Sequence, residues 1–293
     1  MVTELISFEL LPATAIAAVG VLYYVGIRRL AAKNRHWPAK RTVPFFGGIA
    51  CLVVATQSWI AATDTSMFST HVVQHLLMSM AAPILMALGA PVTLLLQASD
   101  RGVQTKVLKV LHSRFVRVVT FPGIGWMLFV ATLFVLYFSG LYGLSLRNEM
   151  FHNFVHLHFF VAGYLFFAPV VAIDPYPWRM HHGLRLLYVG LTLPAHAFLA
   201  LALMSNAEPM NLDWYLAASG WDAERILLDQ RIGAGIMWVS GDLIAIATVA
   251  VVAMQWWKLE DRVAGREDSY VDAINAITVR DDNLSSSSEV PRP

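Results

Sequence analysis

Seven apolar stretches, each long enough to cross a bilayer, constrain the fold of this chain more than any other feature of its sequence. A membrane-spanning helix needs about 20 predominantly apolar residues. Only 14% of the residues are charged, against about 25% in soluble domains. The sequence therefore predicts an all-α, polytopic membrane protein, a bundle of seven transmembrane helices. The stretches lie near residues 8–29, 45–63, 71–97, 123–144, 152–173, 184–204 and 232–257.

Two prolines and a polar tail modify this plan. Pro83 and Pro91 interrupt the third stretch, which we expect to be kinked or to end early. We expect residues 1–260 to form the membrane domain and residues 261–293 to form a polar cytoplasmic tail, disordered at its end. The single cysteine excludes a disulfide or a cysteine metal cluster within one chain.

Lysine and arginine are distributed unevenly between the two sides of the predicted bundle. They are concentrated in the first, third and fifth connections and in the tail, whereas the other side holds only Arg147, Arg225 and Arg231. Cytoplasmic loops carry the excess of positive charge, so the N-terminus is predicted to be outside and the C-terminus cytoplasmic. The net charge of +1 indicates no nucleic-acid partner.

The third stretch opens with His71, Gln74, His75 and Met78. These positions fall on one face of a helix. Lipid offers such groups no partner, so we expect them to face the protein interior or a site. Imidazole together with thioether is a ligand set suited to copper, especially Cu(I).

A second histidine pair opens the fifth stretch. His152 and His156 have the same spacing, and Glu149 lies one turn before them. The predicted orientation places both pairs at the outer ends of their helices, although it does not show that they face each other. We expect an outer copper site formed by His71, His75, His152 and His156, with Met78, Met204 or Glu149 as additional ligands.

Two more polar residues lie deeper in the predicted bundle. His196 precedes Met204 by 8 residues, and Asp242 follows Ile232 by 10, which places them roughly 12 and 15 Å below the outer ends. They form either a deeper ion station, a support that orients a ligand histidine, or a structural hydrogen bond. The acidic connection 205–231 is either a lid over the site or a solvated loop.

Four segments carry a resemblance to a known family: HVVQHLLMSMAAPILMALGAPVTLLL, FHNFVHLHFFVAGYLFFAPV, RLLYVGLTLPAHAFLALALM and LDQRIGAGIMWVSGDL. Together they resemble the CtaG family of multi-spanning cytochrome c oxidase assembly factors. The resemblance implies a bacterial cell membrane protein that helps to mature a haem–copper oxidase, with His71, His75, His152, His156 and His196 at the family's histidine positions. Asp242 stands where glutamate is more usual, and Val155 where an acid is common.

The function that we expect is copper binding and delivery by a protein that is not an enzyme. The cargo is Cu(I) or Cu(II), and the partners are oxidase subunits, a soluble extracytoplasmic copper chaperone and the lipid bilayer. Neutral imidazole binds the metal, so affinity should fall as the pH drops through about 6.5. A copper transporter, a haem-binding protein and a scaffold whose histidines bond one another remain as alternatives.

Overall fold

Every regular element of the computed structural model, which describes residues 9–287, is a helix, as the predicted all-α class requires. The helices are α1 (Leu10–Ala32), α2 (Ala39–Thr56), α3 (Trp59–Thr63), α4 (Phe68–Leu76), the π-helix η1 (Leu77–Ala81), α5 (Ala82–Leu88), α6 (Pro91–Ala98), α7 (Arg101–Leu111), α8 (Arg114–Val119), α9 (Pro122–Tyr137), α10 (Leu141–Arg147), α11 (Glu149–Val171), α12 (His182–Gly190), α13 (Thr192–Met204), α14 (Leu212–Ser219) and α15 (Ala223–Ser287).

The predicted spans agree with the structure, except that the fourth is broken. Six helical segments are long and apolar enough to cross a membrane, and α9 with α10 makes a seventh if that bent pair is one span. The axes of α9 and α10 differ by 77°. The break falls at Ser139 and Gly140, where the Ser139 hydroxyl accepts a hydrogen bond from the Leu141 N–H. Serine and glycine both weaken a helix interior, so the bend has a local cause.

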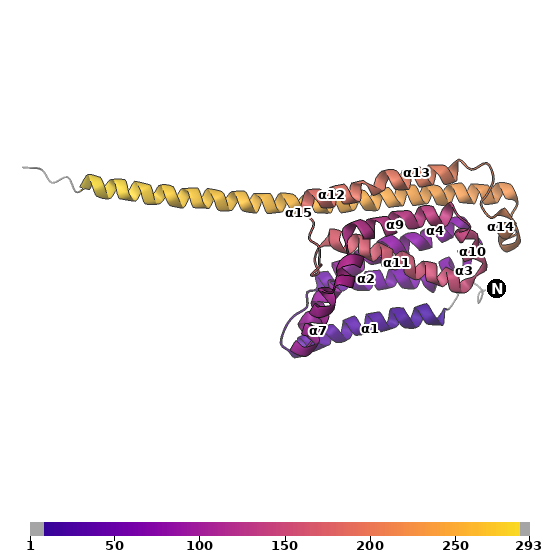
Figure 1. Ribbon diagram of the computed structural model, residues 1–293, viewed down its shortest axis with the longest axis horizontal. Helices are drawn as coiled ribbons and strands as arrows, with labels where there is room; N and C mark the ends of the chain where they lie inside the picture. Colours follow the sequence, from indigo (N-terminus) through magenta and orange to yellow (C-terminus); the bar gives the residue numbers. More distant parts are fainter. Residues whose placement is uncertain (1–8, 288–293) are drawn as a thin grey trace, which may run out of the picture.

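The third span is the centre of the bundle. Its segments α4, η1 and α5 pack against α15 on one side and α2 on the other, and α11 lies along η1 and α5. The helices α12 and α13 pack on α15, whereas α1 lies at the opposite edge beside α2 and α6 (Figure 1). The span that carries the first histidine pair is therefore enclosed by protein.

The expected interruption of this central span is present. The backbone turns left-handed at Ala90, with φ of 51°, and α6 then starts at Pro91. A residue before proline is disfavoured in the right-handed helical region, which explains the position of the break. Pro83 lies in the first turn of α5, directly after the π-helical turn.

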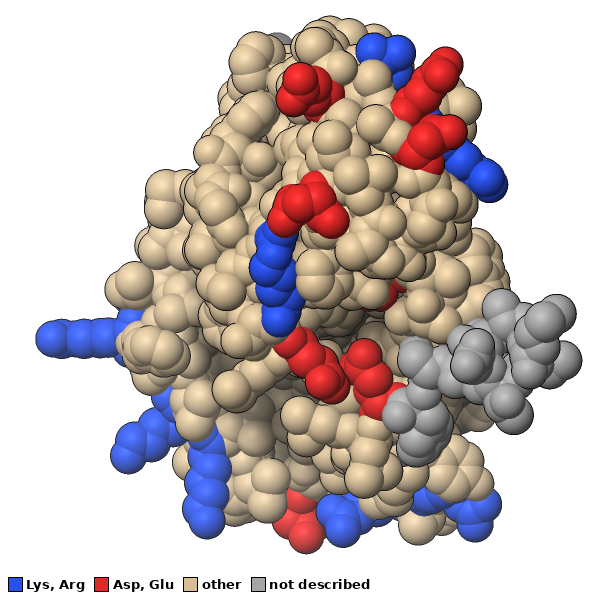
Figure 2. Space-filling model, turned by 90° about the vertical axis from the view of Figure 1, so that its right-hand side faces the viewer, with Lys and Arg blue, Asp and Glu red and all other residues tan. Residues whose placement is uncertain are grey.

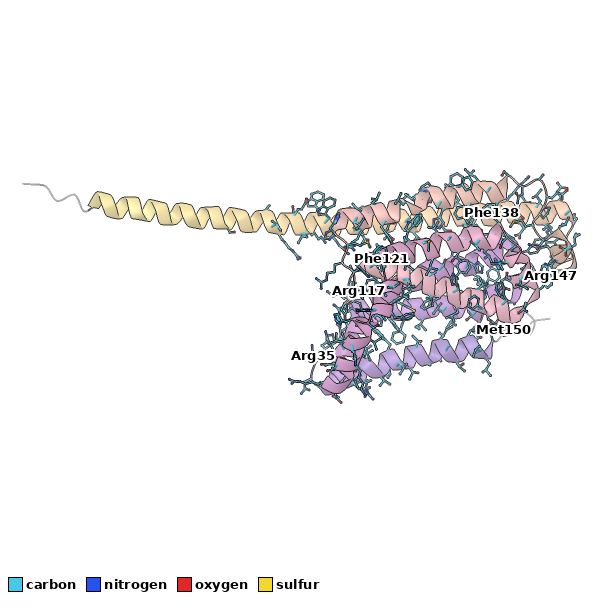
Figure 3. All side chains as sticks on the ribbon, viewed as in Figure 1. Arg35, Arg117, Phe121, Phe138, Arg147 and Met150 are labelled. Atoms are coloured by element: carbon cyan, nitrogen blue, oxygen red, sulfur yellow. The ribbon has the colours of Figure 1, made fainter. Side chains whose placement is uncertain are left out.

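The two ends of the bundle differ in charge. Arg35 and Arg117 lie at one end, which we call the basic end, and Arg147 lies at the other (Figure 3). The second end, which we call the acidic end, carries several acidic side chains around a hollow (Figure 2). Its predicted position outside the membrane stays a prediction.

Helix α15 extends far beyond the bundle at the basic end and runs to Ser287 (Figure 1). The division into a membrane domain and a separate polar tail stays a prediction, and residues 288–293, part of the end expected to be disordered, lie outside the described residues. Large apolar side chains are exposed along the helices, as a lipid-facing surface requires. Examples are Leu22, Phe198, Val239, Leu243 and Ile246. The chain is a multi-pass membrane protein.

Candidate metal centre

Two histidine pairs face each other between α4 and α11. The ring centroids of His71 and His75 are 4.0 Å apart, and those of His152 and His156 are 4.2 Å apart. Between the two helices, the ring centroids of His71 and His152 are 5.7 Å apart, and those of His75 and His156 are also 5.7 Å apart. All four side chains are buried. The structure therefore brings together the four residues that the sequence placed at one depth.

The start of α4 is held by a carboxylate from another helix. Asp229 of α15 accepts hydrogen bonds from the N–H of Ser69, at 3.2 Å, and from its hydroxyl. The first N–H groups of a helix lack partners within the helix, and a carboxylate there also favours the helix dipole. The neighbouring Gln230 donates to the Leu203 carbonyl and accepts from the Met210 N–H. Asp229 thus fixes the start of the helix that carries His71 and His75, whereas Gln230 ties α15 to the end of α13 and to the connection 205–231.

Close contact between α4–η1 and α11 fixes the distance between the pairs. A Cβ at Gly163 of α11 would overlap the carbonyl oxygen of Ser79 and lie 3.0 Å from Pro83 Cγ. Only glycine allows two backbones to approach this closely. The Ser79 hydroxyl donates to the His75 carbonyl at 2.6 Å, which ties this contact to the first pair. At the start of α11, Asn148 caps the helix by accepting from the Phe151 N–H.

Asp64 is a member of the site that the sequence did not single out. It follows α3, is 4% exposed, and accepts a hydrogen bond from His152 Nε2 at 3.0 Å. Asp64, His152 and His156 each offer a ligand atom, and these atoms lie within 4.8 Å of one another. Two donors that are each 2.0 Å from a tetrahedral ion are separated by roughly 3.3 Å. The 3.0 Å between the Asp64 carboxylate and His152 Nε2 is close to this separation, so the three residues could hold a metal ion.

Gln74 determines which nitrogen of His156 is available. Its amide nitrogen donates to the Ala55 carbonyl at 3.0 Å, so its amide oxygen faces His156. His156 Nε2 donates to that oxygen at 3.0 Å. In a neutral imidazole the other nitrogen, Nδ1, then carries the lone pair. That atom is buried and has no hydrogen-bond partner among the described residues.

The first pair has still fewer partners. Both ring nitrogens of His71 and both of His75 are buried without a hydrogen bond to any described residue. Leaving a buried donor or acceptor unpaired costs about 1–3 kcal/mol. Such groups persist where a ligand satisfies them, and neutral imidazole is a frequent ligand of transition metals. The residues present therefore fit a metal ion.

A second carboxylate, that of Glu9, approaches the site from the start of α1. Its backbone is held by Gln57, which accepts from the Glu9 N–H at 3.2 Å and donates to its carbonyl at 3.1 Å. Burial raises the pKa of the Glu9 carboxyl, and the neighbouring charge of Asp64 raises it further. Sequence reasoning missed Glu9 because it is one acid beside an apolar stretch, with no spacing that links it to a histidine.

The connection 205–231 covers the acidic end of the bundle. It contains α14, whose Trp214 Nε1 donates to the carbonyl of Thr65, next to Asp64, at 2.8 Å. Asp213 of the same helix pairs with Arg147 at 2.6 Å, and this hydrogen bond lowers the pKa of Asp213. Trp221 also packs against the core. These contacts indicate that the connection 205–231 is a fixed cover and not a solvated loop.

His196 and Asp242 lie deeper, beside the central span. His196 is buried, and a Cβ at Gly241 of α15 would lie 3.3 Å from its Nδ1. Neither His196 Nδ1 nor Asp242 Oδ1 has a hydrogen-bond partner among the described residues. A cavity of about 20 Å³ lies between His75 and His196, which is room for roughly one water molecule. A cavity the size of one water molecule thus separates His196 from His75 of the first pair.

The other predicted ligands, Met78, Met204 and Glu149, lie on three different elements, η1, α13 and α11. Met78 is buried in the π-helical turn and lines a cavity with His156. Met204 ends α13 and packs against apolar side chains, and Glu149 is exposed in the first turn of α11. His158 instead bonds Thr132 of α9 at 2.7 Å. The proposed roles of Met78, Met204 and Glu149 as ligands stay proposals.

The fold and this site define a multi-pass membrane protein with a buried cluster of histidine and carboxylate. Residues 21–259 match the family of cytochrome c oxidase caa3 assembly factors, Caa3_CtaG. The chain belongs to this family.

Relatives of the chain are longer proteins. An uncharacterized protein of Mycobacterium bovis is 31% identical over 273 residues, which cover 91% of this chain and 41% of the relative. An uncharacterized protein of Mycobacterium leprae is 31% identical over 284 residues, 94% of this chain and 42% of the relative. The chain thus spans about two fifths of the length of these curated relatives. No solved structure matches it.

Proposed function

We propose that this protein binds copper in its histidine cluster and delivers it to cytochrome c oxidase during assembly. The observation that supports copper binding most is that the two histidine pairs face each other. In the first pair, both ring nitrogens of His71 and both of His75 lack a hydrogen-bond partner among the described residues. Imidazole is a ligand of both copper and zinc. Membership of an oxidase assembly family favours copper, because haem–copper oxidases require that metal.

Each residue has a stated role in this proposal. His71, His75, His152 and His156 bind the ion, and Asp64 either joins them or orients His152 through the hydrogen bond to Nε2. His196 and Asp242 form a deeper station or support His75 across the small cavity. Copper would leave by exchange of the histidine ligands for ligands of the oxidase, and no covalent bond of a substrate would be made or broken.

The alternatives have weaker support. Haem with two axial histidines needs space for a large ring between them. The cavity between His75 and His196 has only about 20 Å³, and the cavity of about 330 Å³ beside His156 has that one histidine in its lining. A transporter needs ligands down to the basic end, where Met254 is exposed on the surface. A scaffold needs histidines that bond one another or their neighbours, yet His71 and His75 have no such partners among the described residues.

The partners in this proposal are oxidase subunits and a soluble extracytoplasmic copper chaperone. The cover formed by α14 lies at the acidic end of the bundle (Figure 1) and contacts Thr65, beside Asp64. Copper brought from the aqueous phase would pass this cover before it reaches the cluster. The predicted orientation places this end outside, where such a chaperone would act.

Oxidase maturation in cells tests the function. In cells whose own copy of the gene is deleted, we expect the unaltered protein to restore copper and activity to the oxidase, and His75→Ala/His156→Ala not to restore them. His158→Ala is the matched control, because its ring bonds Thr132 outside the cluster. The measurement is copper per haem in the purified oxidase. Normal copper with the double variant present at normal levels in the membrane would contradict the proposal.

A further inference from the structure

A groove runs along the membrane-spanning part of α1, between this helix and α11. Near the basic end it forms a cavity of about 470 Å³, which α6 also lines. A second cavity, of about 330 Å³, continues it toward the acidic end. Val19, Met86 and Phe160 line both cavities, so the two are parts of one groove. Helix α1 packs against α2 and α6, and the groove leaves its side toward α11 uncovered.

The cavity near the basic end is apolar and opens to the membrane. Leu22 and Leu95 in its lining are 71% and 47% exposed, so it is open toward the lipid-facing surface. The hydrophobic effect disfavours water in a cavity of this kind. The apolar molecules that surround a membrane protein are lipid acyl chains. The chemistry of the walls therefore suits an acyl chain.

The length of the cavity matches one leaflet of a bilayer. Val19 and Arg29 on its α1 wall are separated by 10 residues, roughly 15 Å along the helix axis. This is half of the hydrocarbon core, which is about 30 Å thick. A membrane helix of a partner protein does not fit, because a single turn about 10 Å wide occupies roughly 400 Å³ and a span needs more than five turns.

Arg29 lies where the headgroup of such a lipid would be. It is the charged residue in the lining of the cavity, it is exposed, and its side chain bonds no described residue. The neighbouring Lys33 is instead held by the Ala98 carbonyl, at 3.0 Å, and by Asp100, at 3.4 Å. A guanidinium group binds a phosphate through two parallel hydrogen bonds. Basic pockets between membrane helices bind anionic headgroups.

We propose that this cavity binds one anionic phospholipid, with its phosphate on Arg29 and one acyl chain between Val25 of α1 and Phe160 of α11. The inference goes beyond the proposed function, because no metal takes part in it. The bound chain covers the side of α1 that faces α11 and holds this helix to the bundle. A zwitterionic lipid has the same phosphate, but its ammonium group brings a second positive charge near Arg29. We therefore expect it to bind less tightly.

Native mass spectrometry of the purified full-length protein tests the site during titration with phosphatidylglycerol or phosphatidylcholine. We expect the wild type to bind one phosphatidylglycerol per chain before any phosphatidylcholine. Arg29→Gln should weaken this binding about 10-fold, as expected for the loss of a charged hydrogen-bond donor. Arg28→Gln is the matched control, because Arg28 bonds Tyr24 at 3.4 Å and lies outside the lining. Val25→Trp, which fills the cavity with an indole ring, should also weaken the binding.

Three results would overturn the proposal. Equal affinity of the wild type for the two lipids would exclude an anionic headgroup site, and equal affinity of wild type and Arg29→Gln for phosphatidylglycerol would remove Arg29 from it. Unchanged binding by Val25→Trp would show that the acyl chain lies elsewhere. The comparison of two lipids uses the wild type alone, so it does not depend on the folding of a variant.

Discussion

Gly163→Ala is expected to lower the stability of the protein by about 3 kcal/mol, the upper part of the range for overpacking a tight interior. The added Cβ would overlap the Ser79 carbonyl oxygen and meet Pro83 Cγ at 3.0 Å. Neither is the free end of a flexible side chain, so η1 and α11 must move apart. For a domain of this size the apparent Tm in detergent should fall by roughly 6–12 °C.

The same displacement should weaken metal binding, because Ser79 bonds the His75 carbonyl on one side of the cluster. Gly235→Ala is the control, since a Cβ on this α15 residue would meet no atom within 4 Å. Alanine in a helix is more favourable than glycine by about 1 kcal/mol, so this control should be neutral or stabilising. An equal Tm for Gly163→Ala and wild type would show that the helices do not pack as closely as described.

Asp64→Asn is expected to lower copper affinity by about 10- to 100-fold, as is usual when the partner of a ligand histidine is altered. The carboxylate is 4% exposed, and it accepts from His152 Nε2 at 3.0 Å. The amide of asparagine keeps the shape of the side chain but has no negative charge. In the wild type that charge orients His152 and offsets the positive charge of the bound ion. Affinity is measured by competition with a copper chelator of known strength.

The control for this change is Asp213→Asn at the same end of the bundle. Asp213 is exposed and pairs with Arg147, so its charge faces solvent. An exposed ion pair contributes about 0–1 kcal/mol, so copper affinity should stay the same. Equal affinities for Asp64→Asn and wild type would mean that Asp64 neither binds copper nor orients a ligand.

Much of the fold was predictable, because length and apolarity alone identify a span. The limits of prediction were local. The stretch 123–144 reads as one apolar run, yet Ser139 and Gly140 divide it into α9 and α10. The π-helical turn from Leu77 to Ala81 has no comparable marker, and it changes which way later side chains of the span face. Met78 accordingly lines the space beside His156.

The sequence predicted which residue types form the site and at which depth they lie. It did not predict how the helices and Asp64 surround them. Spacing placed His71 with His75 and His152 with His156, whereas the facing of the two pairs depends on how α4 and α11 pack around Gly163. Asp64 was one acid among several at the same end. Only the turn after α3 directs it inward, and no spacing in the sequence reports such a turn.

The copper content of the purified protein after loading with Cu(I) tests the central claim most directly. The wild type is compared with His71→Ala/His152→Ala, which removes one imidazole from each pair, and with His158→Ala as a control. The account predicts tightly bound copper in the wild type and the control, and its loss from the double variant. Equal copper in all three proteins, or none in any of them, would contradict the account.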